Sequence, residues 1–61
     1  MDHKITAFLV DDHVLVRRGF RRILEDRADI TIVGEASDGA EAVQMACDLR
    51  PRVVLNGLRN A

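Results

Sequence analysis

Two adjacent acids, Asp11 and Asp12, follow the apolar run Ile5–Val10 and precede His13. Carboxylates suit Mg²⁺, which keeps several waters and is often held by one or two of them. Without a third protein ligand, the pair predicts weak Mg²⁺ binding at most and no required cofactor. The alternative role is structural, since acids stabilise the N-terminus of a following helix. His13 is also expected to be structural, because three consecutive residues at a turn do not readily converge on one ion.

Four arginines, Arg17, Arg18, Arg21 and Arg22, recur at helical spacing and would share one helix face. A solvated face is the favoured interpretation, followed by a protein-docking surface and then by a nucleic-acid contact. Four arginines can track phosphates, but the net charge of −1 and the aromatic content of 3% make nucleic-acid binding by this chain unexpected. The one cysteine, Cys47, is expected to be a partly buried packing residue, because no histidine is placed by sequence to activate it.

Five elements are expected to position these side chains. Short apolar runs rich in strand formers predict buried parallel strands, and apolar residues at every third or fourth position predict helices. The strands are expected at about 4–10, 30–36 and 52–56, and the helices at about 13–26 and 39–49. The order β-α-β-α-β favours right-handed parallel crossovers and an α/β layered fold.

The two helices have different signatures. The first is identified by an apolar stripe of Val16, Phe20, Ile23 and Leu24. The second follows turn residues, where Asp38 and Glu41 resemble a capping box. It should end before Pro51, because the residue before a proline avoids the helical region.

A hairpin is the competing interpretation of the C-terminal segment. Asn56 and Gly57 form a frequent two-residue β-turn, so that residues 53–55 would turn back into residues 58–60. The second arm would be polar and only about four residues long, so a third parallel strand is favoured.

Length and composition restrict the class of protein. The 61 residues suffice for one small domain, and a domain of this size buries only about 60% of the surface that its unfolded chain exposes. A single cysteine excludes an intrachain disulfide and suggests a reducing, cytoplasmic setting. The N-terminal apolar run is too short for a signal peptide or a membrane span, so no membrane association is expected.

Several segments, in order and at matching spacing, resemble the receiver domains of response regulators, above all those joined to a LuxR/NarL-type helix-turn-helix. They are residues 8–13, 16–20, 33–42 and 49–55. The resemblance implies a flavodoxin-like (CheY-like) fold, truncated here, with a parallel sheet in the order 2-1-3 and helices on both faces. In that family an acidic pair after strand 1 and an aspartate after strand 3 hold Mg²⁺, and this last aspartate accepts the phosphoryl group.

The chain departs from the family pattern at the phosphoryl acceptor. Gly57 stands where the resemblance places the acceptor aspartate, and glycine has no side chain to phosphorylate. The family's hydroxyl residue after strand 4 and lysine after strand 5 do not occur in the 61 residues. The resemblance therefore implies a degenerate or truncated receiver module that is not an enzyme and does not accept phosphate. It also implies that the first helix, with its arginines, is a candidate docking surface for a histidine kinase.

The third strand would be an open edge in a sheet of this order. Val53, Val54 and Leu55 make that edge apolar, and exposed apolar edges recruit other strands. We therefore expect a homodimer in which this strand pairs with its mate across a two-fold axis.

Three alternative functions stay open. The chain could be a fragment of a longer DNA-binding transcriptional regulator. It could be a weak Mg²⁺-dependent phosphate-handling protein that uses Asp11 and Asp12, or a small nucleic-acid binder that uses the four arginines.

Overall fold

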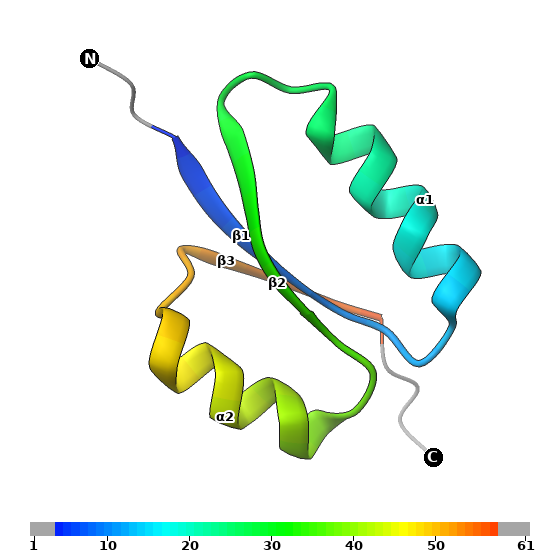
Figure 1. Ribbon diagram of the computed structural model, residues 1–61, viewed down its shortest axis with the longest axis vertical. Coiled ribbons are helices and arrows are strands. Elements are labelled where there is room, and N and C mark those ends of the chain that lie inside the picture. The colour runs from blue at the N-terminus through cyan, green and yellow to red at the C-terminus, as the bar shows by residue number, and fades with distance from the viewer. Residues whose placement is uncertain (1–3, 58–61) are drawn as a thin grey trace.

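The computed structural model describes residues 4–57, in which strands and helices alternate (Figure 1). The elements are β1 (Ile5–Val10), α1 (Val14–Glu25), β2 (Ile30–Ala36), α2 (Gly39–Leu49) and β3 (Val53–Asn56). All strand pairs are parallel, in the order β2-β1-β3. The expected α/β fold, with sheet order 2-1-3 and helices on both faces, is confirmed. Neither described helix is long and apolar enough to cross a membrane.

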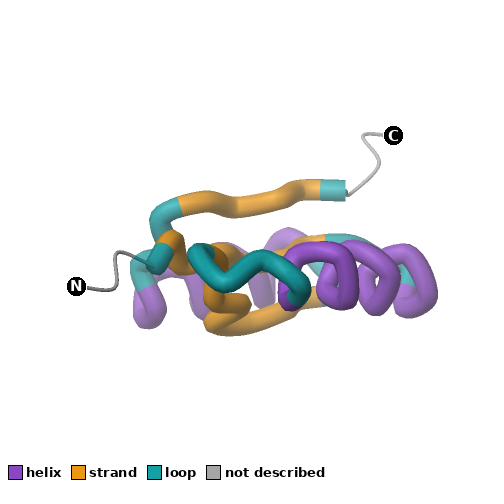
Figure 2. Tube along the Cα trace, turned by 90° about the horizontal axis from the view of Figure 1, so that it is seen from above, coloured by secondary structure: helices purple, strands orange, loops and turns teal. Residues whose placement is uncertain are grey.

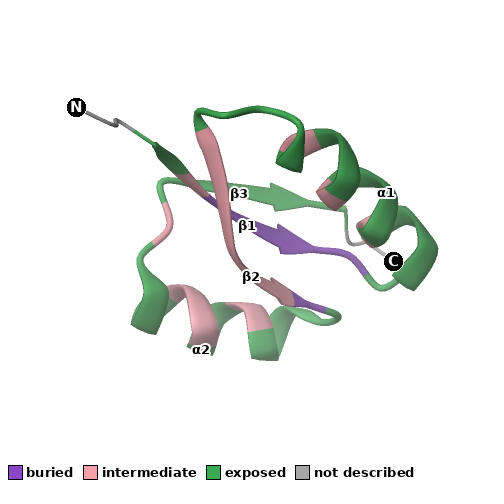
Figure 3. Cartoon of the chain, turned by 45° about the horizontal axis from the view of Figure 1, so that its top comes forward, coloured by how far each residue is buried: buried purple, intermediate pink, exposed green. Residues whose placement is uncertain are grey.

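Strand β1 is the buried centre of the sheet, because it pairs with a neighbour on each side. Residues Ala7 to Val10 are at most 3% exposed, and Phe8 is fully buried. Figure 3 shows much of β1 in the colour of buried residues. An almost unbroken apolar run suits a strand that is covered on both faces. These few residues supply nearly all of the buried core in the described part of the chain.

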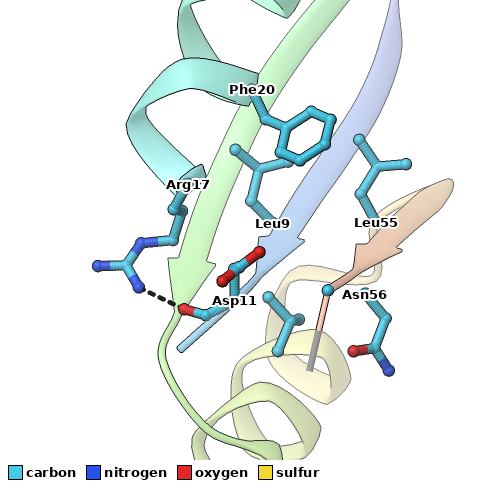
Figure 4. Close-up of a pocket in the computed structure, with 8 residues that line it drawn as sticks. Leu9, Asp11, Arg17, Phe20, Leu55 and Asn56 are labelled. Carbon is cyan, nitrogen blue, oxygen red and sulfur yellow. Dashed lines mark hydrogen bonds between the residues drawn. The ribbon is translucent and has the colours of Figure 1, made fainter. Parts of the chain in front are cut away.

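Successive side chains of β1 point to opposite faces of the sheet. On one face, Phe8 and Val10 pack toward Ala42 and Met45 of α2. Leu9 points to the other face, toward α1 (Figure 4). Among the described helices and strands, β3 lies close to β1 alone, and Figure 2 shows it apart from both helices. Both faces of β3 are therefore left open.

The open flank of β3 also leaves the apolar stripe of α1 uncovered. Val16 is 45% exposed, Phe20 49% and Ile23 65%. The helix is amphipathic as expected, but much of its apolar side faces solvent beside β3. The expectation that Cys47 is partly buried is wrong, because its side chain lies on the exposed side of α2.

Helix α2 begins and ends at local signals in the sequence. The Asp38 carboxylate accepts a hydrogen bond of 2.8 Å from the backbone N–H of Glu41, which is one half of the expected capping box. At the other end, Arg50 has a φ of 48° and its N–H donates to the carbonyl of Ala46. The left-handed residue stops the helix immediately before Pro51.

Strand β3 does not end in the hairpin turn that Asn56 and Gly57 would permit. The favoured two-residue turn needs a positive φ at both residues, and Arg50 alone has one among the described residues. Instead, the Gly57 N–H donates to the Val10 carbonyl at 2.7 Å and continues the pairing with β1. The proposed return arm, residues 58–60, lies outside the described residues.

Gly34 of β2 lies where two core side chains leave no room for a Cβ. A Cβ at this position would lie 2.8 Å from Cε2 of Phe8 and 2.9 Å from Cδ1 of Leu49. Because Phe8 is fully buried and cannot easily move, Gly34→Ala is expected to lower the free energy of unfolding by about 1–3 kcal/mol. Urea unfolding at fixed protein concentration measures this loss.

The matched control is Gly19→Ala. Position 19 lies inside α1, and a Cβ added there would have nothing within 4 Å, so alanine should raise stability by about 1 kcal/mol. Equal effects of the two substitutions would contradict the close packing at Gly34.

Candidate functional site

The two acids lie at the carboxyl end of β1, where the ends of all three parallel strands meet. Asp11 is buried at 6% exposure, and its backbone N–H donates to the Ala36 carbonyl at the end of β2. Asp12 is half exposed. Ligand sites of open parallel sheets lie at this edge, beside the strand where the order reverses. The location therefore matches the site expected from the sequence.

The Asp11 carboxylate bonds to the backbone of the turn that precedes α1. Its Oδ1 accepts a hydrogen bond of 2.7 Å from the backbone N–H of His13. Helix α1 begins with His13 as its N-cap residue, without a side-chain cap and without an acid in the first turn. The structural role of Asp11 is therefore to hold the backbone between β1 and α1, and it does not cap the helix as the sequence suggested.

His13 does converge with the acids, so the geometric expectation that these three side chains diverge is wrong. Its Nδ1 lies 2.8 Å from Oδ1 of Asp12 and 3.5 Å from Oδ1 of Asp11. One ligand atom from each residue lies within 4.8 Å of the others. The turn between β1 and α1 bends sharply enough to bring consecutive side chains together, which spacing along the sequence does not reveal.

Gly57 lies directly against Asp11. A Cβ at position 57 would be 2.3 Å from Oδ2 of Asp11, so this carboxylate lies in the space that a side chain would need. The resemblance drawn from the sequence places the third acid of a Mg²⁺ site at position 57, and glycine has no carboxylate. Of these three positions, Asp11 and Asp12 carry oxygen-bearing side chains.

A cavity of about 140 Å³ opens beside these residues (Figure 4). Leu9, Phe20 and Leu55 form its apolar wall, and Asp11 and Arg17 lie at its polar end. Cavities that hold drug-sized ligands or cofactors are usually about 300–1,000 Å³. The space beside Asp11 and Arg17 is therefore smaller than a usual ligand pocket.

The four arginines do not form one solvated face. Arg17 is only 16% exposed, because its Nε donates to Glu35 at 3.0 Å and its Nη1 to the Asp11 carbonyl at 2.6 Å. Arg21 bonds to the other oxygen of the same Glu35 and pairs with Glu25 at 3.5 Å. The hydrogen bond to Glu35 is the main reason that the pKa of Arg21 is raised. The two arginines therefore fasten α1 to the end of β2.

Arg18 and Arg22 make no such contact among the described residues and stay exposed. Only two of the four arginines, Arg18 and Arg22, therefore remain on the exposed basic face that the sequence predicted. Sequence reasoning missed Glu35, although an acid inside an otherwise apolar strand was a signal for a charged partner on a neighbouring helix.

The apolar edge strand that the sequence predicts is β3. In β3, Val53 is 42% exposed, Val54 47% and Leu55 38%. These exposed fractions are high for apolar residues of a parallel strand, which is normally covered on both faces.

The comparisons with known proteins agree with this fold. The family model of the response regulator receiver domain matches residues 7–59. The transcriptional regulatory protein LiaR of Bacillus subtilis is 48% identical over 54 residues, which are 88% of this chain and 26% of LiaR. Response regulator UvrY of Escherichia coli is 62% identical over 40 residues, which are 66% of this chain and 18% of UvrY. The chain thus spans about a quarter of the length of LiaR.

Two solved structures have the same arrangement of strands and helices. The signal receiver domain of the putative response regulator NarL of Mycobacterium tuberculosis matches with a TM-score of 0.85 and 37% identity, over 88% of this chain and 44% of that one. The response regulator domain of Thermotoga maritima CheB gives a TM-score of 0.82 and 37% identity, over 84% and 38%. The chain belongs to the response regulator receiver domain family.

Proposed function

We propose that this chain is a degenerate, truncated receiver module that does not accept a phosphoryl group and acts through protein association. The contact between Gly57 and Asp11 carries the proposal. Phosphoryl transfer to a receiver needs a carboxylate nucleophile at the end of β3, and position 57 supplies only backbone. The Asp11 carboxylate lies in the space of the absent side chain, where it is held by the His13 N–H.

Incubation with acetyl phosphate and Mg²⁺, followed by intact-mass analysis, tests the loss of phosphoryl acceptance. The chain should stay unlabelled, while an intact receiver domain in the same reaction gains one phosphoryl group. Stable, stoichiometric phosphate on any aspartate would contradict the proposal. Asp11→Asn and Asp12→Asn would then identify the acceptor.

Association with a second copy is the other part of the proposal. A chain of this size is marginally stable alone, and β1 is the one described element that β3 contacts. A homodimer through β3 would cover that open edge. Sedimentation equilibrium at several concentrations should show a discrete dimer, and a monomer throughout would contradict this association.

A histidine kinase is a second proposed partner, by similarity to the family. The exposed Arg18 and Arg22 support docking at α1, whereas Arg17 and Arg21 are occupied by Glu35. Nucleic-acid binding has weak support, because two of its four candidate cations are paired. The family also supports a cytoplasmic location and a role other than catalysis.

A role as a piece of a longer transcriptional regulator is the alternative that the comparisons favour, because the match spans only 26% of LiaR. In that case β3 would be covered by further receiver sequence rather than by a second copy. A concentration-independent monomer with low stability would support this alternative.

A further inference from the structure

We propose that Glu35 anchors α1 and the β1–α1 turn to the sheet as one unit, and that this unit opens separately from the rest of the fold. The unit, called the α1 unit below, comprises residues 11–25, so it includes the turn with the acidic pair. The inference goes beyond the proposed loss of phosphoryl acceptance and does not rest on the proposed association.

The two helices are attached to the sheet by different kinds of side chain. The partly buried residues of α2 are all apolar, namely Ala42, Met45 and Ala46. Ala42 and Met45 pack against the buried cluster around Phe8. The partly buried residues of α1 are two arginines and one leucine, namely Arg17, Arg21 and Leu24. Apolar packing therefore attaches α2, whereas α1 depends largely on charged side chains.

One carboxylate holds both arginines. Arg17 and Arg21 are one helical turn apart, so they lie on the same side of α1. Oε1 of Glu35 accepts a hydrogen bond from Nε of Arg17 at 3.0 Å, and Oε2 accepts one from Nη1 of Arg21. The side chains of Arg17 and Glu35 are only 16% and 25% exposed. Glu35 thus uses both of its oxygens to hold two positions of α1 against β2.

Arg17 extends this attachment to the turn before α1. Its Nη1 donates to the Asp11 carbonyl at 2.6 Å (Figure 4), and its backbone N–H donates to the His13 carbonyl at 2.9 Å. The His13 N–H donates to Oδ1 of Asp11 at 2.7 Å. When α1 leaves β2, the Arg17 side chain cannot stay bonded to both Glu35 and Asp11. Release from Glu35 therefore frees the helix and removes a contact that holds the turn.

The Glu35 carboxylate also sets the cost of the closed state. Glu35→Gln keeps the size of the side chain but removes its charge. Two partly buried guanidinium groups are then left without their charged partner, which is unfavourable. Opening of the α1 unit returns both groups to water, so the substitution favours the open form.

Hydrogen exchange of the 61-residue chain, followed amide by amide by NMR at fixed protein concentration, tests the separate opening. Amides that exchange through a local opening do so at a lower free energy than amides that require global unfolding. They also respond less to urea, because less surface is exposed. The amides of α1 and of His13 should form such a local group, whereas those of β1 should require global unfolding.

Glu35→Gln should speed exchange of the α1 unit by about 10–100-fold, the effect expected when hydrogen bonds to a charged group are lost. Glu25→Gln is the matched control. Glu25 pairs with Arg21 on the helix surface at 3.5 Å, with 56% of its side chain exposed. Its loss should change the rates only about twofold.

Gly34→Ala separates local opening from global unfolding. Its Cβ would meet Phe8 and Leu49, on the α2 side of the sheet. The substitution should speed exchange of the β1 amides and leave the α1 unit unchanged, because the core stays packed when the unit opens. Glu35→Gln should speed both groups, since the contact with Glu35 is broken in either state.

Three results would overturn the inference. The first is exchange of the α1 and β1 amides at one free energy with an equal response to Gly34→Ala. The second is an effect of Glu35→Gln no larger than that of Glu25→Gln. The third is a His13 amide that follows β1 instead of α1, which would separate the turn from the helix.

Arg21→Gln keeps the test possible if Glu35→Gln does not fold. It removes one of the two bonds to Glu35 and leaves the bond of Arg17 in place. Its effect on the α1 unit should lie between those of Glu25→Gln and Glu35→Gln, and an effect equal to that of Glu25→Gln would count against the role of Glu35. Phosphoryl labelling, which tests the proposed function, is measured separately from all of these rates.

Discussion

Val54→Asp is expected to abolish the dimer and, with it, most of the folded state. In the proposed association through β3, Val54 lies in the middle of the pairing strand, so each copy would bring a carboxylate into an apolar interface. An unpaired charge is costly to remove from water. A small domain that already exposes 47% of Val54 and 49% of Phe20 has little stability with which to tolerate that loss.

Sedimentation equilibrium and far-UV circular dichroism at matched concentrations measure the effect of Val54→Asp. Val54→Thr is the control, because threonine keeps the β-branched shape and the strand preference without a charge. The threonine variant should remain a dimer with a modestly weaker association. If Val54→Asp stays a folded dimer, the β3 edge is not the contact.

The fold was predictable because its determinants are local in the sequence. The run Ile5–Val10 is apolar on both faces, which only the central strand of a covered sheet requires, and it became β1. Asp38 and Pro51 mark the ends of α2 through backbone preferences that act over a few residues. Such signals can be recognised in the sequence without knowledge of the tertiary structure.

The pairing of the arginines was not predictable in the same way. Helical periodicity places Arg17 away from the apolar stripe, but it cannot show that Glu35, 18 residues later, comes within 3.0 Å. That contact depends on how α1 lies across β2. Periodicity likewise identified Phe20 as part of an apolar stripe but could not show whether any element covers it.

The candidate site was predictable in its location and not in its detail. The carboxyl ends of parallel strands meet at one edge, so Asp11 and Gly57 were expected to be neighbours. The orientation of the Asp11 carboxylate is a side-chain torsion, however, and the structure alone shows that it lies in the space that a Cβ at position 57 would need. The convergence of His13 with the acids depends in the same way on one sharp turn.

Gly57→Asp is expected to make folding depend on Mg²⁺. The new Cβ would lie 2.3 Å from Oδ2 of Asp11, so that carboxylate must rotate away. The added acid then faces Asp11 and Asp12, and like charges at one site oppose ionisation of all three. In Mg²⁺-free buffer at neutral pH we expect a loss of about 1–3 kcal/mol in the free energy of unfolding.

Mg²⁺ should restore the stability of the Gly57→Asp variant, because three carboxylates and water supply the hard oxygen ligands that the ion prefers. A ligand at 100 times its dissociation constant stabilises a folded protein by about 2.7 kcal/mol. Urea unfolding with and without Mg²⁺, at constant ionic strength and protein concentration, measures the gain. The chain with Gly57 should gain much less, because Asp11 and Asp12 lack the third acid.

Gly57→Asn separates charge from size, since asparagine fills nearly the same volume without a carboxylate. It should show the loss from displacing Asp11 but little recovery with Mg²⁺. An equal response of the asparagine and aspartate variants would mean that the ion acts through Asp11 and Asp12 alone. A large Mg²⁺ response of the unaltered chain would mean that the acidic pair is a working cation site despite Gly57. Because the charge difference between the two variants is confined to position 57, their comparison isolates the contribution of a carboxylate at that position.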